Sequence, residues 1–295
     1  MKLIEECTVG IAGLGLMGGA FAMALRKNCG VSQSRLLACD IDGGVLLQAE
    51  KAALVSGGWT ERNAGEMLAA CDLVFLCLCP AALLGFLEKW ENSFKPGALI
   101  TDIAGIKGCV VKAAEKFRSD VDFIPGHPMA GAEKDGFANA ALCDFRGKNY
   151  ILTPLERNKP ENLAFLKNLI RRMGFGRITE TSAPDHVRKI AFTSQLCHVL
   201  AAALIDCEAD TAITRFGGGS FEDFTRIAMI NAPMWTELFI TNRRALLEYI
   251  SRFENSLGEI KALIQGRDAG ELERCLAGVR GKRMALDSRE TGDAV

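Results

Sequence analysis

Short apolar runs alternate with helix-compatible stretches along the first half of the chain. Strands that are covered on both faces are continuous in apolar residues, because helices pack against both sides of a parallel sheet. The alternation therefore predicts βαβ units around a parallel sheet. The expected strands cover residues 7–12, 35–40, 72–79, 98–103, 121–124 and 149–154.

The pattern changes after the polar stretch "LERNKPEN", residues 155–162. Beyond it, apolar residues recur at helical spacing, as in "HVLAAALIDCEA" and "LFITNRRALLEYISRFENSLGEIKALI". We therefore expect two domains, an α/β domain over residues 1–157 and an all-helical domain over residues 158–295. The small apolar residues of "HVLAAALIDCEA" favour close packing, so we expect a homodimer built through residues after about 162.

A glycine-rich turn, "GLGLMG", lies between the first expected strand and a helix. In this context the motif is typical of a Rossmann dinucleotide-binding domain. Gly13 would make the tight turn, Gly15 would let a pyrophosphate approach, and Gly18 would let helix and strand pack closely. Leu16 and Met17 would begin the helix whose N-terminus faces the phosphates.

Asp40 ends the next expected strand, where a carboxylate can bind the ribose hydroxyls of the cofactor. Its charge would repel a 2′-phosphate, so the sequence favours NAD over NADP. Ligands of such sheets bind beyond the carboxyl ends of the strands. We therefore expect Asp102, in "TDIAGIKG", to contribute to the cofactor site. The motif leaves two alternatives open, which are FAD as the cofactor and a glycine turn without any cofactor.

His127 lies in "GHPMAGAEKDG", residues 126–136, which follows another expected strand as a loop. This position brings it near the nicotinamide, where a neutral imidazole with a pKa near the working pH could act as a general base. A structural histidine that caps the loop is an equally good interpretation of the spacing alone.

Composition limits the possible partners. The chain has 35 basic and 36 acidic residues, which argues against a nucleic-acid surface or a polybasic membrane anchor. We find no apolar run long enough for a membrane span and no signal peptide. The 11 cysteines include no CxxC pair, so we expect reduced thiols in a cytoplasmic protein and no metal site.

Four motifs in order resemble the prephenate and arogenate dehydrogenase family. Besides the glycine-rich turn and "GHPMAGAEKDG", they are "TSQLCH", residues 193–198, and "GGGSFEDFTRIAMINAPMW", residues 217–235. The resemblance implies a Rossmann domain followed by a helical dimerisation domain. It also implies oxidative decarboxylation of prephenate to 4-hydroxyphenylpyruvate with NAD, in tyrosine biosynthesis. The nearest alternative is the same reaction on arogenate.

The resemblance also implies roles for single residues. His127 matches the catalytic histidine, Arg226 the arginine that holds the ring carboxylate, and His198 a histidine near the substrate. The residues that match the lining or gate of the pocket are Glu133, Asp223 and Trp235. From the residues alone, Arg226 could instead be a helix-surface arginine paired with the acid three positions earlier.

Two positions depart from the family pattern within the expected substrate site. Gly105, in "DIAGIK", stands where the family usually has a serine that helps to position the catalytic histidine. Gln195 stands where many members have histidine. His186, at an expected helix start, is as well explained as a capping or surface residue as by any functional role. Lys107 and Lys134 could reach the crevice or lie on the surface.

Two more distant interpretations remain. The β-hydroxyacid dehydrogenases also join a "GLGxMG" turn to a helical domain, but they use a lysine of the second domain and "GHPMAG" has no place in their pattern. A dinucleotide sensor that has lost catalysis is supported only by Gly105.

Overall fold

The computed structural model describes residues 3–132 and 134–287, the last without its side chain. Contacts divide the chain into two compact units, residues 1–243 and residues 244–295. Every candidate residue with a described position belongs to the first unit. Among the described helices, none has both the length and the apolar character that crossing a bilayer requires.

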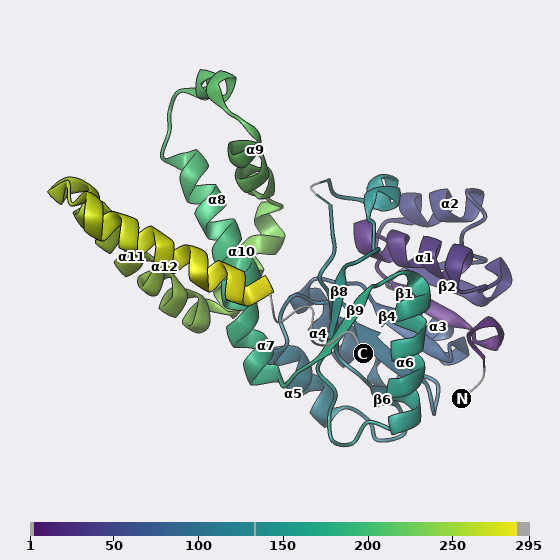
Figure 1. Cartoon of the computed structure of the whole chain (residues 1–295). Helices are drawn as coiled ribbons and strands as arrows, with labels where there is room; N and C mark the ends of the chain where they lie inside the picture. Colours follow the sequence, from purple (N-terminus) through teal and green to yellow (C-terminus); the bar gives the residue numbers. More distant parts are fainter. Residues whose placement is uncertain (1–2, 133, 288–295) are drawn as a thin grey trace. The chain divides into compact units, whose positions relative to one another are not determined.

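A six-stranded parallel sheet forms the centre of the first unit (Figure 1). The strand order β3-β2-β1-β4-β5-β6 places β1 in the middle and confirms the doubly wound α/β prediction. The five strands expected here are present with shorter ends, whereas the two-residue β3 was not predicted. The strands are β1 (Val9–Ala12), β2 (Leu36–Cys39), β3 (Gly58–Trp59), β4 (Leu73–Leu76), β5 (Leu99–Asp102) and β6 (Asp122–Phe123).

Helices cover both faces of this sheet, which is why its strands are apolar throughout. One core includes Phe21 and Phe75 and lies under α1 (Leu16–Asn28), α2 (Gly43–Lys51) and α6 (Pro160–Met173). The other includes Met67 and Leu83 and lies under α3 (Ala64–Ala70), α4 (Pro80–Trp90) and α5 (Gly108–Lys116).

The helix α6 shows that helical spacing alone does not reveal where a helix packs. The Asn28 side chain donates to the carbonyl of Met173, and Arg172 donates to the carbonyl of Cys29. These bonds, with the apolar face of α6, attach the first helix after residue 158 to the sheet.

A second, smaller sheet carries the candidate histidine. Its strands are β7 (Gly126–Pro128), β8 (Asn149–Leu152) and β9 (Arg177–Glu180), with β7 antiparallel to β8. The expectation of a loop at His127 is therefore wrong, because His127 pairs with Ile151 in a short strand. Glycine and proline disfavour strands. Here Gly126 lets the Tyr150 ring lie where a Cβ atom would come within 2.7 Å of it.

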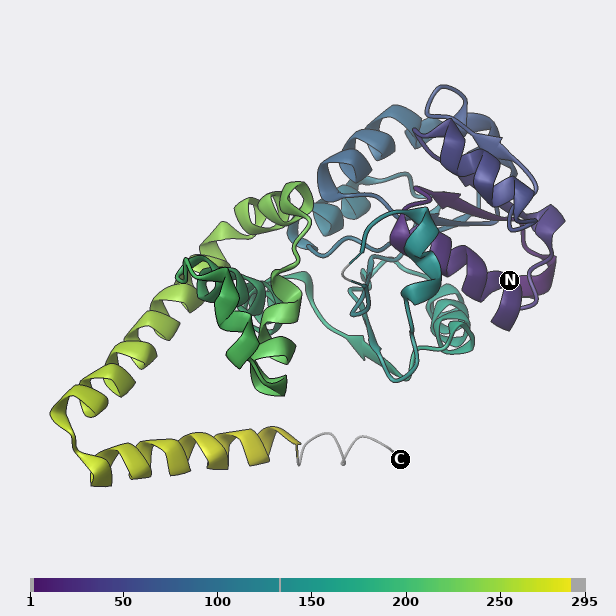
Figure 2. The same ribbon diagram turned by 90° about the horizontal axis from the view of Figure 1, so that it is seen from above.

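The helical part of the first unit begins with one long run (Figure 1), which Figure 2 views from above. It consists of α7 (Ala183–Ile190), the π-helical segment η5 (Ala191–Leu196) and α8 (Cys197–Asp206). The Ser182 side chain caps the run by accepting from the backbone of Asp185. The remaining elements are η6 (Thr211–Phe216), α9 (Gly219–Thr225), η7 (Arg226–Ala228) and α10 (Ala232–Thr241).

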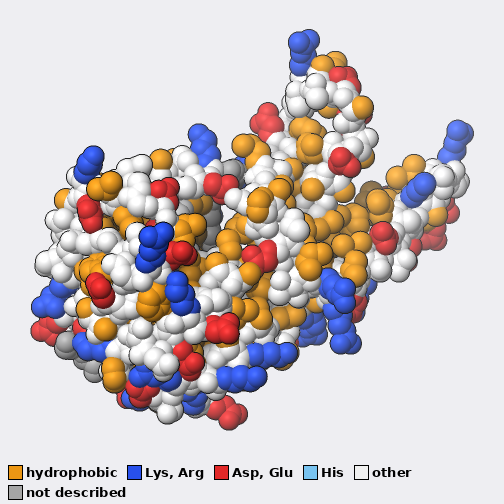
Figure 3. Space-filling model, turned by 180° about the vertical axis from the view of Figure 1, so that it is seen from behind, with side chains coloured by type: hydrophobic (Ala, Val, Ile, Leu, Met, Phe, Trp, Pro, Cys, Tyr) orange, Lys and Arg blue, Asp and Glu red, His pale blue; other side chains and the backbone are white. Residues whose placement is uncertain are grey.

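Apolar side chains are exposed on these helical elements, and Figure 3 shows hydrophobic atoms at their surface. Those that are large and exposed are Phe192, Leu204, Ile205, Ile213, Phe216, Phe224, Met229 and Ile240. In the second unit, α11 (Arg243–Gly266) and α12 (Ala269–Asp287) also expose apolar residues, among them Leu257 and Ile264. Such surface is typical of chains that assemble.

Asp122 joins the edge of the main sheet to the start of α6. It is 6% exposed and accepts from the side chains of Asn158 and Asn162 and from the backbone of Lys159. All of these groups lose a charged acceptor in the Asp122→Ala variant, so we predict a loss of about 3 kcal/mol in the free energy of unfolding. Urea denaturation measures this loss. Asp120→Ala, which breaks an exposed ion pair with Arg118, is the control and should leave stability nearly unchanged.

Candidate functional site

The glycine-rich turn has the geometry that its three glycines predict. Gly13 has a φ of +91°, a value that favours glycine. A Cβ atom on Gly18 would lie 1.9 Å from the carbonyl oxygen of Gly13, so helix α1 can approach the turn only with glycine there. A Cβ atom on Gly15 would meet nothing within 4 Å, which leaves its backbone open to a ligand.

Asp40 lies beside this turn at the end of β2. One carboxylate oxygen accepts from the backbone of Leu14 at 2.6 Å and the other from Asp42 at 2.9 Å. Each oxygen can accept a second hydrogen bond, so the carboxylate can also receive ribose hydroxyls. Leu16 and Met17 begin α1, as expected. An open cradle at a helix N-terminus, with an acid beside it, fits a dinucleotide.

Asp102 and Lys107 form an ion pair whose side chains have no exposed surface. The Lys107 ammonium lies 2.6 Å from one Asp102 oxygen and donates to the Ala104 carbonyl at 2.7 Å. The same Asp102 oxygen accepts from the Ala104 backbone, and the other accepts from Gly126 at 3.1 Å. Burial raises the pKa of Asp102 and lowers that of Lys107, while their mutual attraction opposes both shifts.

This pair has a positioning role within the protein. Asp102 is expected from the sequence to contribute to the cofactor site. In the structure its oxygens accept from the loop after β5 and from the first residue of β7. Lys107 could have reached the crevice or the surface, but in the structure it is fully buried and paired with Asp102. Gly105 lies inside the loop that the pair closes, and His127 directly follows Gly126.

His127 is only partly exposed and contacts a second histidine. Its Nδ1 lies 2.9 Å from Nε2 of His186 on α7, so the interpretation of His186 as a surface residue is wrong. The other nitrogen of His127, Nε2, faces Gly105, where a Cβ atom would lie 3.6 Å away. Leu238 of α10 contacts the same position. Any side chain at position 105 would therefore contact Nε2 of His127.

Both imidazoles of this pair are held neutral. The surrounding protein, and then Lys107, lower the pKa of His127 to about 3. Burial, then His127 and Lys107, lower the pKa of His186 to about 2. The expectation that His127 has a pKa near the working pH is therefore wrong, because burial lowers that pKa. At neutral pH its lone pair is therefore available.

The run from α7 to α8 carries two further candidates. Gln195 lies in the π-helical segment, donates to the Leu238 carbonyl at 3.2 Å and accepts from Asn242 at 2.6 Å. π-Helical segments are frequent at functional sites. His198 contacts the Ser194 carbonyl through Nδ1 at 2.9 Å and stacks on Trp235, with 3.7 Å between the ring centroids. Burial lowers the pKa of His198.

Helix α10 joins the helical part to the loops of the sheet. Glu237 accepts from the backbone of Ala81 in the first turn of α4. Asn231, which caps α10, donates to Asp135 in the loop after β7 at 2.8 Å. With Leu238 at Gly105, these contacts place α10 over the edge where the expected cofactor and His127 meet. Neither Glu237 nor Leu238 carried a signal in the sequence beyond the helical period of its segment.

The remaining candidates lie away from these contacts or outside the described residues. Arg226 begins η7 and Asp223 lies on α9, both on exposed positions of segments that pack against α8. Glu133 lies outside the described residues. Lys134 is exposed. The structure thus brings together His127, Gly105 and Gln195 through Leu238, and it stacks His198 of α8 on Trp235 of α10.

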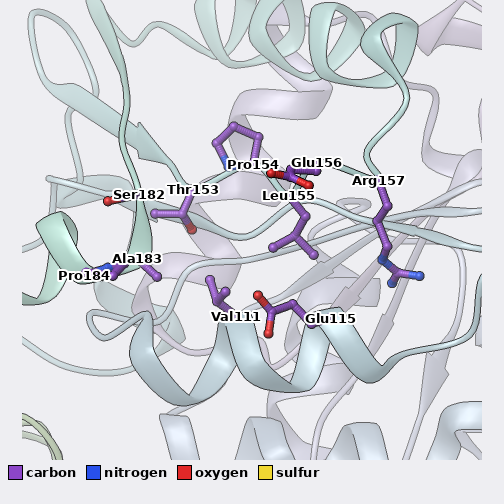
Figure 4. A pocket seen from close by; sticks show the side chains of 10 residues that line it. All are labelled: Val111, Glu115, Thr153, Pro154, Leu155, Glu156, Arg157, Ser182, Ala183 and Pro184. Atoms are coloured by element: carbon purple, nitrogen blue, oxygen red, sulfur yellow. The ribbon is translucent and has the colours of Figure 1, made fainter.

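A separate pocket lies between α5, the segment after β8 and the start of α7 (Figure 4). None of the candidate residues lines it, and the Glu115 carboxylate points toward its centre. Its lining comes from α5, the segment after β8 and the start of α7, and consists of Val111, Glu115, Thr153, Pro154, Leu155, Glu156, Arg157, Ser182, Ala183 and Pro184.

Comparison with known families matches both parts of the chain. The family model described as "Prephenate dehydrogenase, nucleotide-binding domain" matches residues 21–179, and the one described as "Prephenate dehydrogenase, dimerization domain" matches residues 182–278. The chain belongs to the prephenate dehydrogenase family. This confirms the resemblance given by the four motifs.

Curated relatives of this family member carry two names. The chain is 29% identical to the prephenate dehydrogenase of Bacillus subtilis over 97% of its own length and 77% of the relative. It is 28% identical to the cyclohexadienyl dehydrogenase of Zymomonas mobilis over 94% of its own length and 95% of the relative.

Solved structures of the prephenate dehydrogenase family superpose on nearly the whole chain. Prephenate dehydrogenase from Aquifex aeolicus, solved with hydroxyphenyl propionate and NAD+, is 28% identical, with a TM-score of 0.82, over 94% of this chain and 97% of that one. Arogenate dehydrogenase from Synechocystis is also 28% identical, with a TM-score of 0.76, over 94% of this chain and 99% of that one. Both confirm the Rossmann and helical fold class.

The neutral histidine pair predicts that this family member loses free energy of unfolding in acid. In the unfolded chain His186 has its ordinary pKa of 6.5, whereas in the fold it is about 2. Between these values the unfolded state binds the extra proton, so stability falls as the pH falls below 6.5. We expect His186 alone to contribute a slope of up to about 1.4 kcal/mol per pH unit.

Urea denaturation between about pH 7.5 and pH 5 measures this slope. His186→Leu should make it shallower, because leucine does not titrate. His198→Leu is the comparison, since His198 is more exposed and should contribute less. An unchanged slope in His186→Leu would mean that His186 is not held neutral by the fold.

Proposed function

We propose that this protein is an NAD-dependent dehydrogenase that converts prephenate to 4-hydroxyphenylpyruvate by oxidative decarboxylation, as part of tyrosine biosynthesis. The observation that supports this most directly is the position of His127. Its Nε2 faces Gly105 at the loop after β5, on the edge of the sheet where the dinucleotide cradle opens. Membership of the prephenate dehydrogenase family makes this histidine the expected base.

The chain's own residues fit NAD in named positions. The Gly13–Gly18 turn and the start of α1 would hold the pyrophosphate, and Asp40 would hold the adenosine ribose. Bound NAD supplies the hydride acceptor for C4 of the substrate ring. The solved Aquifex aeolicus relative contains NAD+, and the acid at position 40 favours it over NADP here.

His127 would take the proton of the substrate 4-hydroxyl through Nε2 as the hydride leaves. The ring ketone then forms, carbon dioxide is lost and the ring becomes aromatic, so the overall step is downhill. A weak base therefore suffices, provided that it is positioned and carries its lone pair. The low pKa of His127 secures that lone pair, although it weakens the base.

The other candidates would bind the substrate. The planar guanidinium of Arg226 can hold the ring carboxylate by two hydrogen bonds. The stacked His198 and Trp235 offer an aromatic wall and a ring nitrogen, while Gln195 fixes the backbone of α10 beside them. At Gly105, where the family pattern usually has a serine, the substrate hydroxyl would have His127 as its main polar contact. Glu133 is proposed here from the family motif alone.

Arogenate is the second candidate substrate, because the Synechocystis arogenate dehydrogenase is as similar in sequence as the Aquifex enzyme. The two substrates share the reacting ring and differ in the side chain. We further propose a homodimer, supported by the match to a dimerisation domain and by the exposed apolar helices, and a cytoplasmic location, since no disulfide joins the described cysteines.

An assay that follows NADH absorbance tests the substrate and the cofactor together. Prephenate with NAD should give the highest kcat/KM, and NADP should be used poorly because Asp40 repels its 2′-phosphate. Asp40→Ala should narrow the preference for NAD. Equal use of both cofactors by the unmodified protein would contradict the role of Asp40. Turnover of arogenate without turnover of prephenate would make arogenate the substrate.

His127→Asn tests the base. Asparagine can still bind the substrate hydroxyl but cannot take its proton, so kcat should fall about 100-fold or more while KM changes little. Above about pH 5, kcat/KM of the unmodified protein, which reports the ionisations of the free enzyme, should show none from His127, because burial lowers the pKa of His127 to about 3.

Two further variants serve as comparisons. Arg226→Ala should mainly raise KM for prephenate, because the ring carboxylate loses its partner. Gly105→Ser restores the family residue and should be tolerated, with its hydroxyl near Nε2 of His127. A near-normal kcat in His127→Asn would make the imidazole a structural residue and would contradict the mechanism.

A further inference from the structure

The contact between His127 and His186 joins two elements that lie far apart in the sequence. His127 belongs to β7 and His186 to the second turn of α7, and their rings are inclined by 56° with centroids 5.1 Å apart. His186 is 1% exposed, so its position is fixed by packing. It therefore offers a rigid partner to a nitrogen of the proposed base.

The hydrogen bond decides which nitrogen of His127 can act. Since Nδ1 contacts His186, Nε2 is the nitrogen that faces Gly105. A neutral imidazole carries one proton, and the nitrogen without it is the one that accepts. Nε2 is a base only in the tautomer that has the proton on Nδ1, and that tautomer needs an acceptor at 2.9 Å.

We propose that His186 is the positioning residue that gives His127 this tautomer. Its unprotonated Nε2 accepts the Nδ1–H of His127, so that the lone pair of His127 lies on Nε2, toward the substrate. The role rests on the proposed function, in which His127 is the base. After the reaction His127 is an imidazolium, with Nδ1–H still bonded to His186 and Nε2–H carrying the proton from the substrate.

The charges around the pair keep that proton on His127. Lys107 is the cation that acts on both rings, and its partner Asp102 is bonded to Lys107, Ala104 and Gly126. A second positive charge on His186 would be fully buried near Lys107, whereas His127 is partly exposed toward the site. His186 is therefore an acceptor that orients the base and does not carry the proton onward.

The remaining nitrogen of His186 supports a functional reason for its presence. In the proposed arrangement His186 carries its proton on Nδ1, which is buried and has no hydrogen-bond partner among the described residues. A buried donor without a partner destabilises a fold. A residue kept only for packing would be better replaced by leucine, so His186→Leu should fold at least as stably at neutral pH while it loses activity.

Nuclear magnetic resonance of the ring nitrogens tests the tautomer without any substrate. The chain has three histidines, so 15N-histidine labelling of the full-length protein gives few signals, and single variants assign them. We expect His127 with its proton on Nδ1, and a shift of that proton toward Nε2 in His186→Leu. A proton on Nε2 of His127 in the unmodified protein, or no change in His186→Leu, would overturn the proposal.

Kinetics of three variants complete the test. His186→Leu should lower kcat about 10- to 100-fold with little change in KM, because the base is misoriented. His186→Gln should recover much of kcat, since its side-chain oxygen can accept near the position of Nε2. Lys189→Leu, on an exposed position of α7, is the matched control and should leave kcat unchanged.

These results separate the two proposals. Normal kcat in His186→Leu would overturn the role of His186, and so would a glutamine variant as inactive as the leucine variant. If the unmodified protein oxidises neither prephenate nor arogenate, the proposed function fails, while the tautomer of His127 and its dependence on His186 still decide whether His186 positions it.

Discussion

The buried ion pair between Asp102 and Lys107 is the constraint on which the site depends. Two charges without exposed surface need partners and hydrogen bonds, and here they pair with each other and bond to Ala104 and Gly126. They close the loop that contains Gly105 and fix the residue before His127. Removing either Asp102 or Lys107 would leave the other as an unpaired buried charge. Removing Asp102 would also remove the hydrogen bonds that hold the loop of Gly105 and the start of β7.

The helical part depends on the same edge of the sheet. His186, Gln195 and His198 follow one another along one continuous run, which goes from α7 through the π-helical segment to α8. Helix α10 lies against it through Leu238 and Trp235 and also contacts the start of α4. The expected cofactor, the proposed base and the proposed substrate-binding side chains therefore lie in one connected frame, which suits a reaction whose main demand is orientation.

Electrostatics in this frame favour neutral imidazoles over charged ones. Lys107 and the surrounding protein act in the same direction on both histidines and lower both pKa values. The lowered pKa values make the proposed base weaker and predict a fold that loses stability in acid. A reaction that ends in an aromatic ring and released carbon dioxide tolerates a weak base, so availability of the lone pair matters more than its strength.

The sequence by itself determined the local features of this protein. The apolar runs predicted the strands of the main sheet. The glycine spacing predicted a turn in which the backbone requires glycine at Gly13 and Gly18 and is open at Gly15. The motifs were sufficient for the family. These features depend on residues that are close together in the chain, where period and backbone conformation can be read directly.

Only the tertiary structure decided the contacts between distant segments. It put α6 on the sheet, turned residues 126–128 into a strand against β8, buried Asp102 against Lys107 and brought His186 to His127. A histidine near a helix start has the same local pattern whether it caps, is exposed or supports a base. Its partner lies 59 residues away, and packing, which no local pattern encodes, decides that contact.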